Sequence, residues 1–476
     1  MTKVMLVNPP WYPKCPLDRV RKKNVRVPNP GLLKIAESLL QNDIKVDYVE
    51  LGMREDINIK KEMVDTIKNK KPDIVGVTGG ACEYDGAVEV INNVKAIDNS
   101  IMTIGGGIHF TLNHKDILES GDGKFFDIIV RKEGEITILN LVDAFEGKKE
   151  LKNIDGITYR EGKRIKVNKD IPEMLKPKVL EKVWKILNYS NYYFEGRKGF
   201  GIAINTMHGC NQKCSFCSEP LRWNGISLMN AEDIVKQIMI LKEKVKPEYV
   251  FFADSNFNIS TDRIMKFIKL MKEYDLFMPF KSENRLDKIF EQRRLLPNLR
   301  DVGAALIFCG GERTTNAGLN FFNKNQSSSI MLKAARAIQD AEIGLMMTFI
   351  FGVVDDNIKN MKQMVKQIQY INPELPAFCA YTPFPGLPER EKIKKYIRVN
   401  DLRYYTMNNA ICDTKFVSFN DIQSFIDDAW LSFYAKHENY EKFANHSNPE
   451  TRKMGISWYK GLKQEPKFKE NFELSL

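Results

Sequence analysis

The feature that most constrains this chain is a set of three closely spaced cysteines. Cys210, Cys214 and Cys217 follow the apolar stretch GIAINT (201–206) with the spacing CxxxCxxC. Soft thiolates gathered in one loop favour an iron–sulfur cluster. Three ligands would leave one iron of a four-iron cluster without a protein ligand, and that iron would be open for chemistry. A structural zinc loop is the alternative. It would need a fourth ligand, for which His208 is the local candidate.

The remaining composition argues against several classes of protein. The other five of the eight cysteines are scattered, so the chain is no disulfide scaffold and we expect it in the reducing cytoplasm. It has no apolar run long enough to span a bilayer, and residues 1–7 do not form a signal peptide, so we expect no membrane partner. The net charge of +11 is spread along the chain. That spread argues against nucleic acid as a partner and is compatible with a lysine-rich surface or an anionic ligand.

In the first half of the chain, apolar strand patterns alternate with amphipathic helices. Strand patterns cover 2–7, 44–51, 72–80, 100–107 and 125–130, and helical patterns cover 30–41, 61–70, 84–97 and 133–145. This alternation predicts an α/β fold with a doubly wound, Rossmann-like parallel sheet. A hairpin at 156–168 would close this domain over residues 1–168. Right-handed crossovers put the loops after the strands on one edge, where ligands bind in such sheets. These loops are Asn8, Thr78–Gly80, Gly105–His109 and Arg131–Gly134.

The second half contains another series of strands and helices. Residues 169–200 are expected to be a linker, and six strand patterns then follow at 201–206, 250–254, 279–284, 302–308, 345–353 and 376–384. Six units predict a partial, open (β/α)6 barrel over 201–390 rather than a closed eight-unit barrel. A helical C-terminal segment, 391–476, is expected to lie over the barrel mouth. Its aromatic residues would be either core or part of a substrate pocket; they are Tyr404, Tyr405, Trp430, Tyr434 and Trp458.

The cysteine spacing, with Phe216 before the third cysteine, resembles the signature of the radical S-adenosylmethionine (SAM) superfamily. The resemblance implies a [4Fe-4S] cluster on the three cysteines, with SAM bound to the open iron by its amino and carboxylate groups. It also implies that the barrel strand ends contact the rest of SAM. The residues so implied are Asp254 and Ser255 near the SAM amino group, Glu283 and Arg285 on the next strand end, Glu312 of CGGERT at the ribose or methionine, and Tyr381 beside adenine. Lys324 is expected to be a near-neutral control for Glu312.

The first half resembles the cobalamin-binding domain that precedes the radical domain in one subgroup of this superfamily. The matching elements are VNPP (7–10), GVTGG (76–80), GGGIHF (105–110) and RKEGE (131–135). The cobalamin contacts so implied are Asn8, Pro10, Thr78, Gly79, Gly80, Gly106, Gly107, His109, Glu133 and Gly134. The histidine motif DxHxxG is absent, so we expect His109 to lie near the corrin without binding cobalt. An ordinary flavodoxin-like domain, or an empty vestigial one, is the alternative.

Together the two resemblances imply a cobalamin-dependent radical SAM methyltransferase that methylates an unactivated carbon. A second hypothesis is a non-methylating radical enzyme on the same scaffold, such as a cyclase, dehydratase or epimerase, with cobalamin redox-active or absent. A third is an electron-transfer or sensor protein without catalysis. The expected partners are a small-molecule or peptide or protein substrate and an external electron donor such as flavodoxin or ferredoxin.

Overall fold

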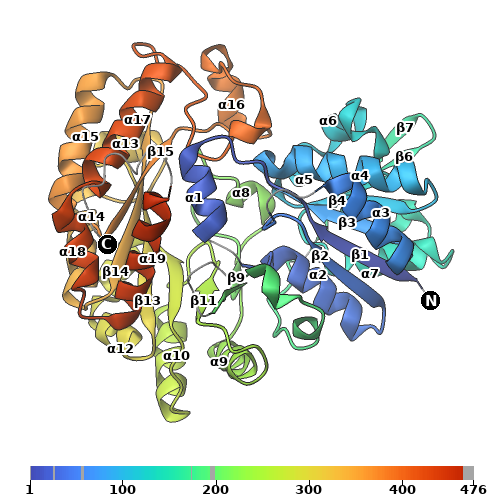
Figure 1. Ribbon diagram of the computed structural model, residues 1–476, viewed down its shortest axis with the longest axis horizontal. Helices are drawn as coiled ribbons and strands as arrows, with labels where there is room; N and C mark the ends of the chain where they lie inside the picture. Colours follow the sequence, from blue (N-terminus) through green and yellow to red (C-terminus); the bar gives the residue numbers. More distant parts are fainter. Residues whose placement is uncertain (1, 25–26, 55–57, 173, 193–198, 465–476) are drawn as a thin grey trace.

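Two largely separate sheets, one from each half of the chain, organise the molecule (Figure 1). The computed structural model describes residues 2–24, 27–54, 58–172, 174–192 and 199–464. The first sheet and its helices are called the first domain below, and the second sheet with its helices is called the barrel. Among the described residues, no helix is both long enough and apolar enough to cross a bilayer.

The first domain has seven strands in the order β2-β1-β3-β4-β5-β6-β7. The strands are β1 (Lys3–Asn8), β2 (Lys45–Glu50), β3 (Ile74–Thr78), β4 (Met102–Gly106), β5 (Ile128–Val130), β6 (Ile157–Glu161) and β7 (Arg164–Val167). The first five are parallel, and β6 and β7 add an antiparallel hairpin at the edge. The helices are α2 (Pro30–Gln41), α3 (Ile59–Lys70), α4 (Tyr84–Ile97), α5 (Ile108–Leu112), α6 (His114–Glu119) and α7 (Thr137–Phe145). The doubly wound sheet and the closing hairpin are confirmed.

Local sequence explains where the first helices begin and why the ligand edge lies where it does. Asn29 accepts hydrogen bonds from the amides of Gly31 and Leu32, and Pro30 opens the first turn of α2. The strand order reverses direction at β1, which lies between β2 and β3. The carboxyl ends of β1 and β3, at Asn8 and Thr78, therefore flank the point where such sheets bind ligands.

The barrel sheet has six parallel strands, and its spatial order follows the chain, β8-β11-β12-β13-β14-β15. The strands are β8 (Gly201–Ile204), β11 (Tyr249–Phe252), β12 (Phe280–Asn284), β13 (Ala304–Glu312), β14 (Gly344–Phe351) and β15 (Leu375–Ala380). The helices between them are α8 (Glu219–Arg222), α9 (Ala231–Ile240), α10 (Thr261–Glu273), α11 (Leu286–Glu291), α12 (Leu296–Asp301), α13 (Asn316–Phe321), α14 (Ser328–Asp340) and α15 (Ile358–Ile371). Since β8 and β15 are both terminal in this order, the barrel is open, as predicted.

Side-chain caps fix the starts of the long barrel helices. Asn230, Ser260, Ser327 and Asn357 each accept a hydrogen bond from a backbone amide in the first turn of the helix that follows. Such caps satisfy donors that a helix leaves unpaired, and they are local in sequence. They explain why the strand–helix alternation could be predicted.

The C-terminal helices lie elsewhere than expected. Trp430 and Tyr434 of α17 (Phe419–Tyr434) donate hydrogen bonds to the carbonyls of Phe378 and Pro376 on β15. They thereby satisfy the free edge of the open sheet. Thr451 of α19 (Pro449–Lys463) bonds the amide of Gly344 and a carbonyl at the start of β13, which is the amino end of the barrel. The expectation of a lid over the mouth is therefore wrong for α17, α19 and the intervening α18 (His437–Ala444), which cover the edge and the amino end.

Two segments join the halves of the molecule. The helix α1 (Pro16–Asn24), which the sequence analysis did not predict, packs on α19, and its Asp18 accepts hydrogen bonds from Thr406 and Asn408. The expected linker, 169–200, is described except for 173 and 193–198. In it the amides of residues 182 and 183 donate to Glu37 of α2. The short helix α16 (Pro388–Lys392) follows the barrel.

Candidate functional site

The three cysteines lie in a loop whose two ends are held together by a short antiparallel pair. The strands β9 (Met207–His208) and β10 (Ser227–Leu228) pair before and after the loop. Gly209 has φ +79°, and a side chain there would meet the carbonyl oxygen of Gly225 at 1.9 Å. Only glycine allows this close approach. The backbone therefore confines the cysteines to one tight loop at the carboxyl end of β8.

The thiols of the loop are partly buried and interact electrostatically with one another. The amide of Cys217 donates to the carbonyl of Cys214, which turns the chain between them. Burial raises the pKa of Cys217 to about 12. Burial also raises the pKa of Cys214, although Lys324 and Arg285 favour its thiolate. A bound metal deprotonates such thiols outright, so cationic neighbours suit a cluster of thiolates. Within the described residues, no three His, Cys, Asp or Glu side chains are gathered tightly enough for a single metal ion.

Glu312 ends β13 at the mouth of the barrel and is paired with Lys324. Its carboxylate lies 2.6 Å from the Lys324 ammonium, which also donates to the carbonyl of Gly310 at 2.7 Å. A side chain on Gly310 would meet both groups, so glycine at 310 makes room for this pair. Both charged side chains are buried. The expectation that Lys324 lies on a helix as a near-neutral control is wrong, because it is the ion-pair partner of Glu312.

Asp254 has partners other than the predicted SAM ammonium. Its carboxylate accepts hydrogen bonds from the amides of Thr206 and Met207 at 2.6 and 3.0 Å, and from the Thr206 hydroxyl. It is fully buried beside Arg263, and burial raises its pKa. The adjacent Ser255 donates to Glu219. Asp254 thus fixes the backbone of Thr206 and Met207, which leads into the cysteine loop.

Glu283 and Arg285, both expected to contact SAM from the next strand end, have different partners in the structure. Glu283 is half-buried near the end of β12, and its carbonyl accepts from the amide of Phe257. Arg285 lies just after the strand and is buried, with its guanidinium paired in bidentate fashion to Asp287 and bonded to the carbonyl of Asn325. The Arg285 guanidinium, which the resemblance implied as a SAM contact, is therefore bonded to other protein groups.

An apolar cluster joins the barrel mouth, the cysteine loop and the first domain. Phe216 of the loop packs against Phe322, with ring centroids 4.8 Å apart, and Tyr381 packs against the other side of Phe322 at 5.8 Å. Ala81, which follows the GVTGG turn of the first domain, belongs to the same cluster. The Tyr381 hydroxyl is buried without a hydrogen-bond partner in the described structure. The two strand-end rims therefore meet at this cluster.

The rim of the first domain is built from loops that bind one another. The side-chain amide of Asn8 donates to Glu50 at 2.8 Å. A side chain on Gly86 would meet the carbonyl oxygen of Pro10 at 2.0 Å. Backbone hydrogen bonds join the other rim loops: the amide of Gly79 donates to the carbonyl of Gly106, and the amide of His109 donates to the carbonyl of Gly79. The amide of Gly80 donates to the carboxylate of Glu83. Gly107 has φ +96°, and a side chain there would meet Thr78. Close backbone approach is thus required of this rim.

Two expected rim residues are buried against other protein groups. His109 is buried, with its ring against Tyr84 and Phe110, and burial lowers its pKa to about 4. That His109 does not bind cobalt stays a prediction. Glu133 is also buried, and its carboxylate lies 3.1 Å from the ring of His208 in the barrel. Gly134 packs against the side chain of Ile35.

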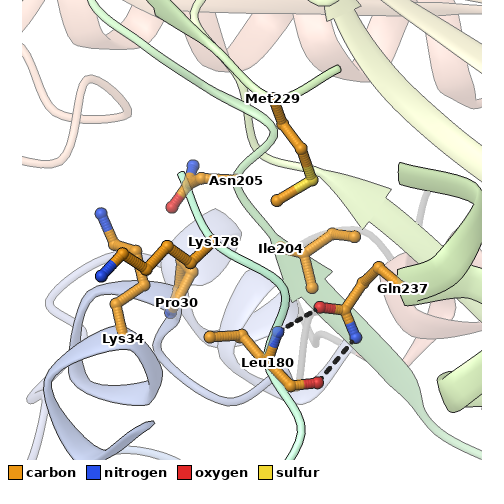
Figure 2. Close-up of a pocket in the computed structure, with 8 residues that line it drawn as sticks. All are labelled: Pro30, Lys34, Lys178, Leu180, Ile204, Asn205, Met229 and Gln237. Carbon is orange, nitrogen blue, oxygen red and sulfur yellow. Dashed lines mark hydrogen bonds between the residues drawn. The ribbon is translucent and has the colours of Figure 1, made fainter. Parts of the chain in front are cut away.

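Two cavities lie beside the cysteine loop and the first domain. A cavity of about 10 Å³ lies between α2, the segment 178–180 and the end of β8 (Figure 2). Lys34 and Lys178 extend side by side there, and Gln237 bonds the backbone of Leu180. A larger one, about 120 Å³, is lined by α2, the residues just before α7 and the segment 175–180.

Comparison with known families decides the classification. Residues 19–142 match the B12 binding domain, and residues 204–368 match the radical SAM superfamily. The chain belongs to the B12-binding radical SAM enzymes. The two matches fall on the first sheet and on the barrel sheet. The cysteine loop and the glycine rim, whose donor types suit a thiolate-bound cluster and a flat macrocycle, lie within these matches. The expected cofactors, a [4Fe-4S] cluster, SAM and cobalamin, are those of this class.

Relatives of this radical SAM enzyme differ in reaction. An anaerobic magnesium-protoporphyrin IX monomethyl ester cyclase from Cereibacter sphaeroides is 24% identical over 396 residues, covering 82% of this chain. The chain spans only 64% of that cyclase's length. An uncharacterized methyltransferase from Pyrococcus horikoshii is 25% identical over 448 residues, covering 91% of this chain and 93% of the relative.

Solved structures share the fold of this radical SAM enzyme. The cobalamin-dependent SAM radical enzyme OxsB, with aqua-cobalamin and SAM bound, has a TM-score of 0.72 at 17% identity and covers 98% of this chain, which covers 71% of OxsB. The radical SAM methyltransferase TsrM from Kitasatospora setae, with tryptophan and a SAM analog, has a TM-score of 0.68 at 14% identity, with 99% of each chain covered. At these identities the likeness establishes the architecture and leaves the reaction open.

Several residues at the site were missed by sequence reasoning. They are Lys34 and Lys324, from elements distant in the chain, and Glu219 and Trp223, from the segment that follows the cysteines. Each contacts a predicted site residue or His208. None lies in a motif with a local signal. The signal that could have pointed to Glu219 and Trp223 is their nearness to the cysteines in the chain.

Proposed function

We propose that this chain is a cobalamin-dependent radical SAM methyltransferase acting on an unactivated carbon. The observation that carries the proposal is the junction formed by Ala81, Phe216 and Tyr381, where the rim of the B12-binding domain meets the cysteine loop and the barrel mouth. A substrate held there would lie between the methyl source and the radical source. When bound, the cluster and SAM supply the 5′-deoxyadenosyl radical, and cobalamin supplies the methyl group.

The protein's own groups have distinct tasks in this proposal. Cys210, Cys214 and Cys217 hold the cluster. Glu312, paired with Lys324, accepts hydrogen bonds from the ribose or ammonium of SAM. Tyr381 has a buried hydroxyl with no hydrogen-bond partner among the described residues. A buried hydroxyl without a partner costs free energy, and a hydrogen bond from this group to a bound ligand would remove that cost. The apolar cluster around Tyr381 keeps water from the radical, because a radical attacks whatever lies nearest.

A non-methylating reaction is the second candidate, because the relatives include cyclases as well as methyltransferases. Mass spectrometry separates the two. Incubation with substrate, a reductant, SAM and methylcobalamin should give a product heavier by one methylene if the proposal holds. Label from SAM bearing a deuterated methyl group should appear in that product. A product that has lost hydrogen or water, with no methyl label, would establish the second candidate.

Substrate and electron donor remain part of the proposal. The net charge of +11 favours an anionic small molecule or an acidic peptide region as substrate, and a flavodoxin or ferredoxin as donor. The division of the chain into 1–168, 169–200, 201–390 and 391–476 is likewise proposed as its domain organisation. Limited proteolysis would test it, with first cuts expected between 169 and 200.

A further inference from the structure

Two stacked rings close the base of the cysteine loop. His208, just before the loop, and Trp223, just after its last cysteine, lie with parallel rings whose centroids are 4.6 Å apart at an interplanar angle of 7°. Both side chains are buried. The cysteines lie between them in the chain, so the position of this ring pair, called the loop base below, helps to set where the thiols are held.

Side chains of the B12-binding domain contact the loop base. Glu133 lies 3.1 Å from Nδ1 of His208, and Lys34 lies 2.9 Å from its Nε2. An ammonium can only donate, so Nε2 is assigned as the acceptor. Nδ1–H then donates to the carbonyl of Leu175 at 3.2 Å, and the Glu133 carboxylate lies beside the same nitrogen. Lys132 adds a hydrogen bond of 3.1 Å to Asn224, next to Trp223. Lys34 of the first domain thus holds one ring nitrogen of His208. The other nitrogen contacts Leu175, whose amide donates in turn to the Glu133 carboxylate at 3.0 Å.

The loop base is also tied to the barrel. Trp223 donates from its indole nitrogen to Glu219 at 2.9 Å, and Ser255, just after β11, donates to the same carboxylate. A continuous set of contacts therefore runs from Glu133 through the loop base to the barrel mouth. Glu133 lies in the rim loop after β5, at the edge of the first sheet where a ligand binds.

We propose that Glu133 and His208 are positioning residues that couple the B12-binding domain to the cysteine loop, so that cobalamin bound in one domain stabilises the cluster in the other. Glu133 thereby acts on the loop rather than as the direct cobalamin contact that the resemblance implied. A ligand that orders the rim loop holds Glu133 in place, and Glu133 then holds His208. This coupling rests on the cofactors and does not depend on whether methyl transfer is the reaction.

Iron loss from the reconstituted protein tests the coupling without any turnover. The protein carrying its cluster is mixed anaerobically with an iron chelator, with and without saturating hydroxocobalamin, and the release of iron is followed by absorbance. In the unaltered protein we expect cobalamin to slow the release about fivefold or more, the lower end of ordinary coupling between sites. In Glu133→Ala this ratio should fall to about one, with cobalamin affinity within about threefold of normal. Glu133→Gln keeps an acceptor for the amide of Leu175, which holds His208, and should restore most of the protection.

A matched control separates this coupling from general loosening of the domains. Glu37 is a second buried carboxylate of the first domain; it accepts from the amides of Lys182 and Val183 at 2.8 Å and does not touch the loop base. Glu37→Ala should keep the cobalamin protection. The proposal is overturned if cobalamin gives no protection in the unaltered protein, if Glu133→Ala keeps it, or if Glu37→Ala loses it equally.

A second variant covers the case in which Glu133→Ala fails to take up iron. His208→Phe keeps a ring to stack on Trp223 and loses the hydrogen bonds to Lys34 and Leu175 together with the polar contact to Glu133. It should bind a full cluster and show no cobalamin protection, and its reduced cluster should give the same electron paramagnetic resonance spectrum with and without cobalamin. Protection that persists in His208→Phe would refute the coupling.

Discussion

The buried carboxylate of Glu50 should make the stability of the first domain fall as pH rises. Glu50 ends β2 beside Asn8, which donates to it at 2.8 Å, and Tyr192 of the linker donates at 3.1 Å. Burial raises its pKa from 4.5 to about 7, against the effect of these hydrogen bonds. Between these two values the folded state keeps a proton that the unfolded state has lost, so stability declines as pH rises through that window and is then constant.

The size of the effect follows from the shift. A change from 4.5 to about 7 corresponds to about 3 kcal/mol between the two ends of the window. Glu50→Gln removes the titration while its amide can still accept from Asn8 and donate to the oxygen of Tyr192. The variant should therefore have about the same free energy of unfolding as the unaltered protein near pH 4.5. At pH 8 its free energy of unfolding should be higher by up to about 3 kcal/mol.

Urea unfolding of the apoprotein, measured from pH 4.5 to 8.5 by tryptophan fluorescence, checks this expectation. Trp184 is buried near the first domain and reports on the region. Glu119→Gln, at an exposed position of α6, is the control, and its free energy of unfolding should depend on pH in the same way as that of the unaltered protein. If the free energy of unfolding of Glu50→Gln shows the same pH dependence as the unaltered protein, the stated protonation of Glu50 is wrong.

Further predictions concern the cofactors. Replacing any cysteine of the loop by alanine should reduce the iron content from about four per chain to near zero, measured by chemical iron assay, and a retained full cluster would refute the ligand assignment. Glu312→Ala and Lys324→Ala should each weaken SAM binding roughly ten- to hundredfold in equilibrium titrations, because each leaves a buried charge unpaired, with no change in iron content. Lys362→Ala, at an exposed position of α15, is the control, and equal affinities in all three variants would remove the ion pair from the site. The bound corrinoid should show a histidine-free spectrum that His109→Ala leaves unchanged, since that ring is buried beside Tyr84; signs of imidazole coordination would contradict this.

Local patterns carried most of the fold. The strand–helix alternation, the caps of the long barrel helices and the hairpin at 156–168 depend on residues close in sequence, and all appear in the structure. The helix α1 escaped notice because it is short and highly charged, and it is held by Asp18 bonding to Thr406 and Asn408 near the far end of the chain. The position of α17 could not be predicted because it depends on which sheet edge stays open.

The sequence by itself determined the chemistry of the site, because thiolates at CxxxCxxC spacing and glycines after parallel strands have few other uses. Only the tertiary structure decided which side chains face the cofactors. Lys324 pairs with Glu312, and Glu133 turns to His208, since these contacts depend on how distant elements pack and where each side chain then points. Charged groups buried by packing must find a partner, and that partner is selected by proximity in space, which sequence spacing does not record.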